Sequence, residues 1–144
     1  MNTSTPEHCP ECGAQKVEGL DCWNQLCLIL AWESNDPALW ALHFVIVAAY
    51  NLQHPAKFTD EAYLQLRQVF IDYLENCIGI PEIRQRVSKS SDGQKRVEKP
   101  AAERIPILRR WNQTIDSVCG SNTPEGAAQR VKNWAESIRK ELAG

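Results

Sequence analysis

The sequence predicts an all-α protein, a small helical bundle with a cysteine-bearing zinc-knuckle loop at its N-terminus. Apolar residues recur every three or four positions in several stretches, as they do on the buried face of a helix. Helix-capping residues stand before these stretches. Four of the six cysteines fall within the first 27 of the 144 residues. We expect a single domain over residues 1–144, because a chain of this length fits around one core.

The N-terminal segment, residues 1–20, is expected to form the metal-knuckle loop. It shows no helical periodicity and contains two prolines and two glycines. Residues 21–87 are then expected to form a helical hairpin and a third helix. Asp21 is placed to cap the first helix of the hairpin, which should end near residue 34.

The second helix of the hairpin is the most apolar stretch of the chain. Asp36 is its cap, Pro37 occupies its first position and Pro55 stops it, which gives a buried helix of about 18 residues. The β-branched residues 45–47 leave a strand as the alternative. Because the linker between the two helices is very short, they should pack antiparallel.

The third helix has the clearest amphipathic pattern. Thr59 is expected to cap it, acidic residues follow in its first turn, and Gly79 is placed to end it. Its apolar positions recur at three and four residues and include Cys77. Pro81 should open a further short helix that ends near residue 88.

The rest of the chain divides into a mobile basic linker, residues 88–101, and a C-terminal helical segment, residues 102–144. The linker has too little apolar content to pack. In the C-terminal segment Thr114 should cap a turn or short helix, and Thr123 with Pro124 should start the last helix. Four apolar residues before these helices are expected to dock on the body: Ile105, Ile107, Leu108 and Trp111.

Charge is unevenly distributed along the chain, although the net charge is only -2. Residues 84–110 hold nine basic and three acidic side chains. Such a stretch can bind the phosphate backbone of a nucleic acid. The mildly acidic chain and the absence of a base-reading motif nevertheless favour a solvated loop over nucleic-acid binding. Without a secretory signal or an apolar run of about 20 residues, we expect a cytoplasmic protein with no membrane contact.

The cysteines predict a metal site. In a reducing compartment they are not expected to form disulfides. Cys9 and Cys12, in the sequence CPEC, can grip zinc from one side, but zinc needs four ligands. A redox role for CPEC is the weaker alternative, since no preceding strand or βαβ pattern is present. Cys77 and Cys119 are expected to be buried structural thiols.

The helical hairpin indicates where the missing ligands lie. If the chain turns near residue 36, partners across the hairpin have numbers that sum to about 71. His54, at the end of the second helix, then neighbours Cys22, at the start of the first, where the Cys9 and Cys12 loop leads in. Pro55 holds His54 out of helical geometry. We therefore predict a structural Cys₃His zinc site at Cys9, Cys12, Cys22 and His54.

Two histidines have alternative interpretations. His54 can instead meet the last carbonyls of its helix without any metal. His43 is the reserve ligand, because it shares a helix face with His54, but it should face Cys27 and Leu28, and it can equally be a buried, hydrogen-bonded histidine. Cys27 is expected to be a core thiol, because five helical residues rotate it about 140° away from Cys22. His8 is expected to be solvated.

The sequences CPECGA, DCW and AAYNLQHP together resemble a bacterial family of small proteins classed only as a domain of unknown function. The resemblance covers residues 9–55, and VKNWAESI is similar to the C-terminal helix of that family. The position two before the tyrosine, acidic in such relatives, is Ala48 here. The family implies no activity. It implies these signature residues: Cys9, Cys12, Cys22, His43, Tyr50, Gln53, His54 and Pro55.

Three functions remain open from the sequence. The first is a zinc-stabilised helical module that binds a protein or a small apolar molecule. The second is a metal-dependent enzyme with an open zinc site that uses His43 and His54, with Glu33 or Tyr50 as acid or base. The third is weak nucleic-acid binding through residues 84–110. The first is the hypothesis that we carry forward.

Overall fold

The computed structural model describes residues 8–90, 98–120 and 123–143. Within these ranges the chain is helical and forms no strand, only isolated β-bridges, so the all-α prediction is confirmed. None of the described helices is long and apolar enough to cross a membrane. The α-helices are α1 (Cys22–Trp32), α2 (Pro37–Trp40), α3 (His43–Leu52), α4 (Asp60–Asn76), α5 (Ile80–Ser90), α6 (Asp116–Cys119) and α7 (Ala127–Ala143).

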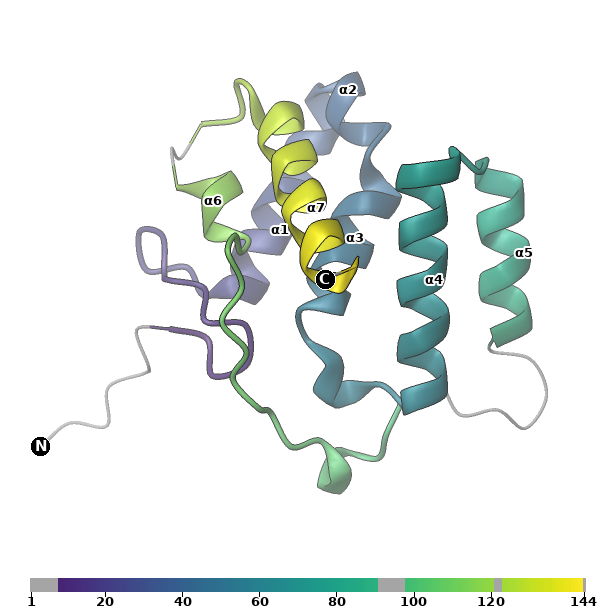
Figure 1. Cartoon of the computed structure of the whole chain (residues 1–144). Helices are drawn as coiled ribbons and strands as arrows, with labels where there is room; N and C mark the ends of the chain where they lie inside the picture. The colour runs from purple at the N-terminus through teal and green to yellow at the C-terminus, as the bar shows by residue number, and fades with distance from the viewer. Residues whose placement is uncertain (1–7, 91–97, 121–122, 144) are drawn as a thin grey trace, which may run out of the picture.

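The helices form a bundle in which α3 packs against both α4 and α7, while α5 covers the outer side of α4 (Figure 1). The C-terminal helix α7 also packs against α6, which in turn contacts α1. The core between them is fully buried and includes Trp134 of α7, Phe70 of α4, Ile46 of α3 and Ile29 of α1. This core fixes the first and third helices relative to each other, and the N-terminal loop lies near their ends (Figure 1).

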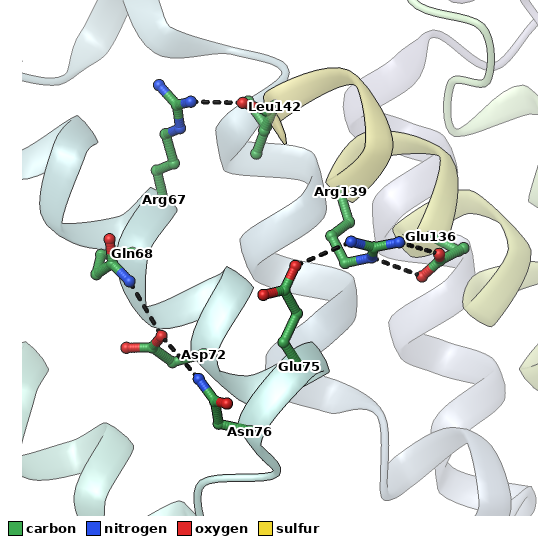
Figure 2. Close-up of polar contacts among 8 residues, drawn as sticks. All are labelled: Arg67, Gln68, Asp72, Glu75, Asn76, Glu136, Arg139 and Leu142. Atoms are coloured by element: carbon green, nitrogen blue, oxygen red, sulfur yellow. Dashed lines mark hydrogen bonds and ion pairs between the residues drawn. The ribbon is translucent and has the colours of Figure 1, made fainter. Parts of the chain in front are cut away.

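Polar contacts join α4 to α7 along their exposed sides, as Figure 2 shows. The Arg67 guanidinium donates to the Leu142 carbonyl at 2.5 Å, and Arg139 pairs with Glu75 at 2.9 Å. Arg139 also pairs with Glu136 on its own helix. Such exposed pairs contribute little stability individually, so the buried apolar contacts carry most of the packing energy.

The predicted caps are present at three helices. The side chain of Asp21 accepts from the Asn24 N–H, that of Asp36 from the Leu39 N–H, and that of Thr59 from the Ala62 N–H. Each occupies one of the N–H groups that a helix start leaves unpaired.

The second predicted helix is not continuous, which corrects the sequence interpretation. It breaks between α2 and α3, where the Leu42 N–H bonds the carbonyl of Leu39, three residues back, and Leu42 has left the helical region at φ -99° and ψ 13°. No glycine or proline marks the break. It allows α2 to pack against α7 separately from α3.

The end of α4 also differs from the prediction. The helix ends at Asn76, and Cys77 rather than Gly79 terminates it in the left-handed conformation, with φ 53° and ψ 41°. Cys77 is consequently exposed, so its expected burial is wrong. The helix predicted from Pro81 to about residue 88 is present as α5, which begins one residue earlier and ends two residues later.

The segment before α6 is extended, and we call residues 104–111 the strap. Of its four apolar residues only Trp111 packs against the core, whereas Ile105 and Ile107 are 71% and 76% exposed. The expected docking of these two isoleucines is therefore wrong. Of the proposed linker 88–101, residues 91–97 lie outside the described residues and residue 98 forms a bridge with Phe58.

Candidate metal centre

The CPEC sequence forms a tight loop in which backbone N–H groups point at sulfur. The Cys9 Sγ accepts from the N–H groups of Glu11 and Cys12 at 3.4 and 3.5 Å, and the Cys12 Sγ accepts from the Ala14 N–H at 3.4 Å. The Cys9 N–H bonds the Ala14 carbonyl across the loop. Gly13 has φ +79°, a conformation that side chains other than glycine rarely adopt. These N–H donors stabilise negative charge on the two sulfurs.

Two helix ends bring the other ligand atoms to this loop. Cys22 is the first residue of α1, and His54 follows α3, where Pro55 begins a 3₁₀ turn. The His54 Nε2 lies 3.3 Å from the Cys22 Sγ and 3.6 Å from the Cys9 Sγ. The ligand atoms of Cys9, Cys12, Cys22 and His54 all lie within 4.8 Å of one another. Such a cluster could hold a metal ion.

The orientation of the His54 ring suits a ligand. Its Nδ1 lies 2.6 Å from the carbonyl oxygen of Tyr50, which can only accept, so Nδ1 carries the proton. In the neutral ring the lone pair then lies on Nε2, the atom that faces the sulfurs, where a metal ion would bind it. The capping alternative is also realised by this contact, because Tyr50 is in the last turn of α3; one ring nitrogen serves the helix and the other the cluster.

Tyr50 itself forms one wall of the site. Its ring stacks on the His54 ring with centroids 4.0 Å apart, and its hydroxyl lies 3.7 Å from the Cys22 Sγ. Trp23 meets the same tyrosine ring edge-on at 6.0 Å. Within these aromatic contacts Tyr50 and His54 are both buried.

The thiols and the imidazole of the site shift one another's pKa through their hydrogen bonds. Hydrogen bonds from Cys12 and then Cys22 lower the pKa of Cys9 far below its ordinary value, while contacts with Cys22 and Cys9 raise the pKa of Cys12. Burial by itself lowers the pKa of His54, but hydrogen bonds to Cys22 and Cys9 outweigh it and raise that pKa to about 10. A bound cation would replace the protons of these thiols, as metal binding at thiols requires.

Two side chains hold the site together although they are not ligands. The Glu11 carboxylate accepts from the Ala56 N–H at 2.7 Å and so ties the CPEC loop to the segment after His54. Gln53 is buried, donates to the Gln113 carbonyl at 2.8 Å and accepts from the Trp134 indole at 3.2 Å. The resemblance pointed to Gln53, but nothing in the sequence pattern indicated the role of Glu11.

The remaining candidates lie outside the cluster. The His43 Nδ1 is 2.9 Å from the buried carboxylate of Glu33 rather than beside Cys27, so the structure does not bring the reserve ligand to the site. Cys27 is exposed, which corrects its assignment as a core thiol, whereas Cys119 is buried as expected. His8 is exposed, as predicted for a solvated residue.

Comparison with known proteins gives one finding. A family model described as "Family of unknown function (DUF5946)" matches residues 7–143, nearly the whole chain. No curated protein and no solved structure matches. The site must therefore be interpreted from its own chemistry.

Proposed function

The chain belongs to this family of unknown function (DUF5946), and we propose that it is a zinc-binding interaction module whose Cys₃His site is structural. In this proposal Cys9, Cys12, Cys22 and His54 are the four ligands. Zinc is favoured over harder cations because thiolate and imidazole are the donors it prefers.

The observation that carries the proposal is the spacing of the donor atoms. Zinc bonds sulfur at about 2.3 Å and nitrogen at about 2.0–2.1 Å, so a tetrahedral ion places a sulfur and a nitrogen about 3.6 Å apart. The distances from the His54 Nε2, 3.3 Å to the Cys22 Sγ and 3.6 Å to the Cys9 Sγ, lie close to this value. The Cys12 Sγ completes the donor set, since all four donor atoms lie within 4.8 Å of one another.

A structural role follows from the number of protein donors. Four ligands complete a tetrahedron, whereas catalytic zinc keeps one position for water or substrate. The enzyme hypothesis needs His43 in the site, and that ring contacts Glu33 instead. We therefore favour stabilisation over catalysis.

The bound ion would fix the loop of residues 8–20 to the helices. This loop has few apolar side chains of its own, although Cys12 and Ala14 are buried. Metal binding can supply the free energy that such a segment lacks. A loop held in this way presents a stable surface to a partner, and this is why we propose an interaction module.

We further propose a bacterial cytoplasm as the setting. All six cysteines are free thiols, which fits a reducing compartment, and zinc thiolates persist where oxidants are scarce. The bacterial assignment rests on the sequence resemblance alone.

Metal analysis of protein purified without added zinc tests the proposal. Wild type and Cys27→Ala, whose thiol is exposed and outside the cluster, should each retain about one zinc per chain. Cys22→Ala and His54→Ala should lose most of it, because each removes one of four ligands. Full occupancy in both variants would show that the ion is held elsewhere.

A further inference from the structure

A cavity lies against the outer side of the CPEC loop, between this loop and the strap. Its volume is about 280 Å³, and its lining includes Cys12 and Gly13 of the loop and Leu108, Arg110 and Trp111 of the strap. The Arg109 N–H donates to the Glu11 carbonyl at 3.1 Å and anchors the strap beside the loop. The cavity is thus built from two segments that are far apart in the sequence.

An unpaired donor is buried in the wall of this cavity. The indole Nε1 of Trp111 has no hydrogen-bond partner among the residues that the structure describes. The Arg109 guanidinium lies over the indole ring at 3.8 Å from its centroid and leaves the N–H edge unpaired. Buried donors without an acceptor are uncommon in folded proteins and costly, so an outside acceptor that reached this N–H as the side chains of the cavity adjust would be stabilised by the hydrogen bond.

The charges around the cavity favour an anionic acceptor. Arg110, the His8 ring and the Thr114 hydroxyl are further donors in its lining, and among the described residues only the hydroxyl is shown with an acceptor, Asp116. Two carboxylates near the cavity are already engaged: Asp116 accepts from the Thr114 hydroxyl and the Gln15 N–H, and Glu141 accepts from the Asn112 N–H. A carboxylate could accept from both the Trp111 indole N–H and the Arg110 guanidinium. Hydrogen bonds to a charged group are stronger than those between neutral groups.

The strap adds an apolar surface next to this pocket. Ile105 and Ile107 are two residues apart on extended chain, so they share one side of it, and both are more than 70% exposed. Leu108, the next residue, is 46% exposed and lies in the lining of the cavity, so the strap carries apolar side chains both beside the cavity and in its wall. Aliphatic side chains beside a carboxylate pocket match a peptide that carries both apolar and acidic residues.

The same features disfavour a nucleic acid as the ligand. Single strands are held by exposed aromatic platforms on which bases stack, whereas the exposed apolar residues of the strap are aliphatic and the Trp111 ring is covered by Arg109. Two arginines of the basic stretch are already ion-paired, Arg86 with Asp72 at 2.5 Å and Arg104 with Glu98 at 3.0 Å. These ion pairs reduce the positive charge that is available to bind the phosphate backbone of a nucleic acid.

We infer that the cavity and the strap bind an acidic, apolar peptide segment of a partner protein. A carboxylate of the peptide accepts from the Trp111 N–H and from Arg110, and neighbouring apolar side chains cover Ile105 and Ile107. The inference rests on the proposed function, because two residues of the zinc loop, Cys12 and Gly13, form one wall of the pocket.

A titration of ¹⁵N-labelled protein with two synthetic peptides tests the inference. The acidic probe is acetyl-LDIEL-amide, and its neutral match is acetyl-LNIQL-amide. The chain has five tryptophans, and Trp111→Phe identifies the indole resonance of residue 111. We expect this resonance to move downfield with the acidic peptide alone, since only the carboxylate supplies a charged acceptor.

Affinity in variants then separates the pocket from the zinc site. Arg110→Ala should weaken the acidic peptide roughly tenfold or more, because it removes a charge-assisted hydrogen bond. The control Arg84→Ala removes an exposed arginine of α5 outside the lining and should leave affinity within about twofold. Both variants should retain wild-type zinc content.

Four results would overturn the inference: equal binding of the two peptides, no binding of either at about 1 mM, equal losses in both arginine variants, or displacement of the acidic peptide by a single-stranded oligonucleotide. A wild type that binds the acidic peptide as expected but purifies without zinc would instead overturn only the metal proposal. The two failures are therefore distinguishable.

Discussion

Replacement of Gln53 by leucine should destabilise the protein by about 3 kcal/mol. The side chain is 1% exposed and joins the Gln113 carbonyl to the Trp134 indole N–H. Leucine has a similar volume, so little cavity forms, but the buried Trp134 indole N–H and the partly buried Gln113 carbonyl lose their partner. Each unsatisfied group costs about 1–3 kcal/mol, so two give roughly 2–6 kcal/mol, and the lower part of this range applies because the Gln113 carbonyl is only partly buried.

Urea unfolding followed by circular dichroism measures this loss. In a thermal scan the same change should lower Tm by about 10 °C, at roughly 3 °C per kcal/mol for a chain of this size. The control Gln129→Ala removes an exposed glutamine of α7 and should change the free energy of unfolding by less than about 0.5 kcal/mol. If Gln53→Leu were as stable as this control, Gln53 would not be the buried link that the structure shows.

Two further predictions concern thiol reactivity and pH. A thiol reagent should modify the two exposed cysteines, Cys27 and Cys77, rapidly in the native protein, and three more only after a chelator removes zinc; Cys119 should react last, since burial raises its pKa to about 12. Immediate modification of all six would contradict the site. The hydrogen bond from Arg86 lowers the pKa of Asp72, so wild type should be more stable than Asp72→Asn at pH 7, and the difference should vanish as the pH falls below about 4. A pH-independent difference would contradict that role.

Local signals in the sequence were sufficient to predict the all-α fold class and the proximity of the donor atoms of the candidate metal site. The caps Asp21, Asp36 and Thr59 fix where helices begin, and the short linker after residue 34 forces the chain to fold back. Once it does, the start of α1 and the end of α3 are neighbours. Their two donor residues, Cys22 and His54, therefore meet without any detailed knowledge of packing.

Features set by tertiary contacts were not predictable. The break before α3 has no glycine or proline to mark it and depends on the separate contact of α2 with α7. The His43 ring contacts the buried carboxylate of Glu33 rather than the metal site. These residues are ten positions apart on either side of α2, and helical periodicity does not predict such a contact. The exposed Ile105 and Ile107 have the composition of core residues, so hydropathy alone assigned them to the core.

X-ray absorption at the zinc edge of the purified protein tests the central claim most directly. The account predicts three sulfur neighbours at about 2.3 Å and one nitrogen at about 2.0–2.1 Å, with no oxygen in the shell. The His54→Ala variant, reconstituted with zinc, should replace the nitrogen scatterer of imidazole with an oxygen or lose the ion. A wild-type spectrum with two or fewer sulfurs, or with a bound water oxygen, would contradict a closed Cys₃His site and would favour an open, catalytic one.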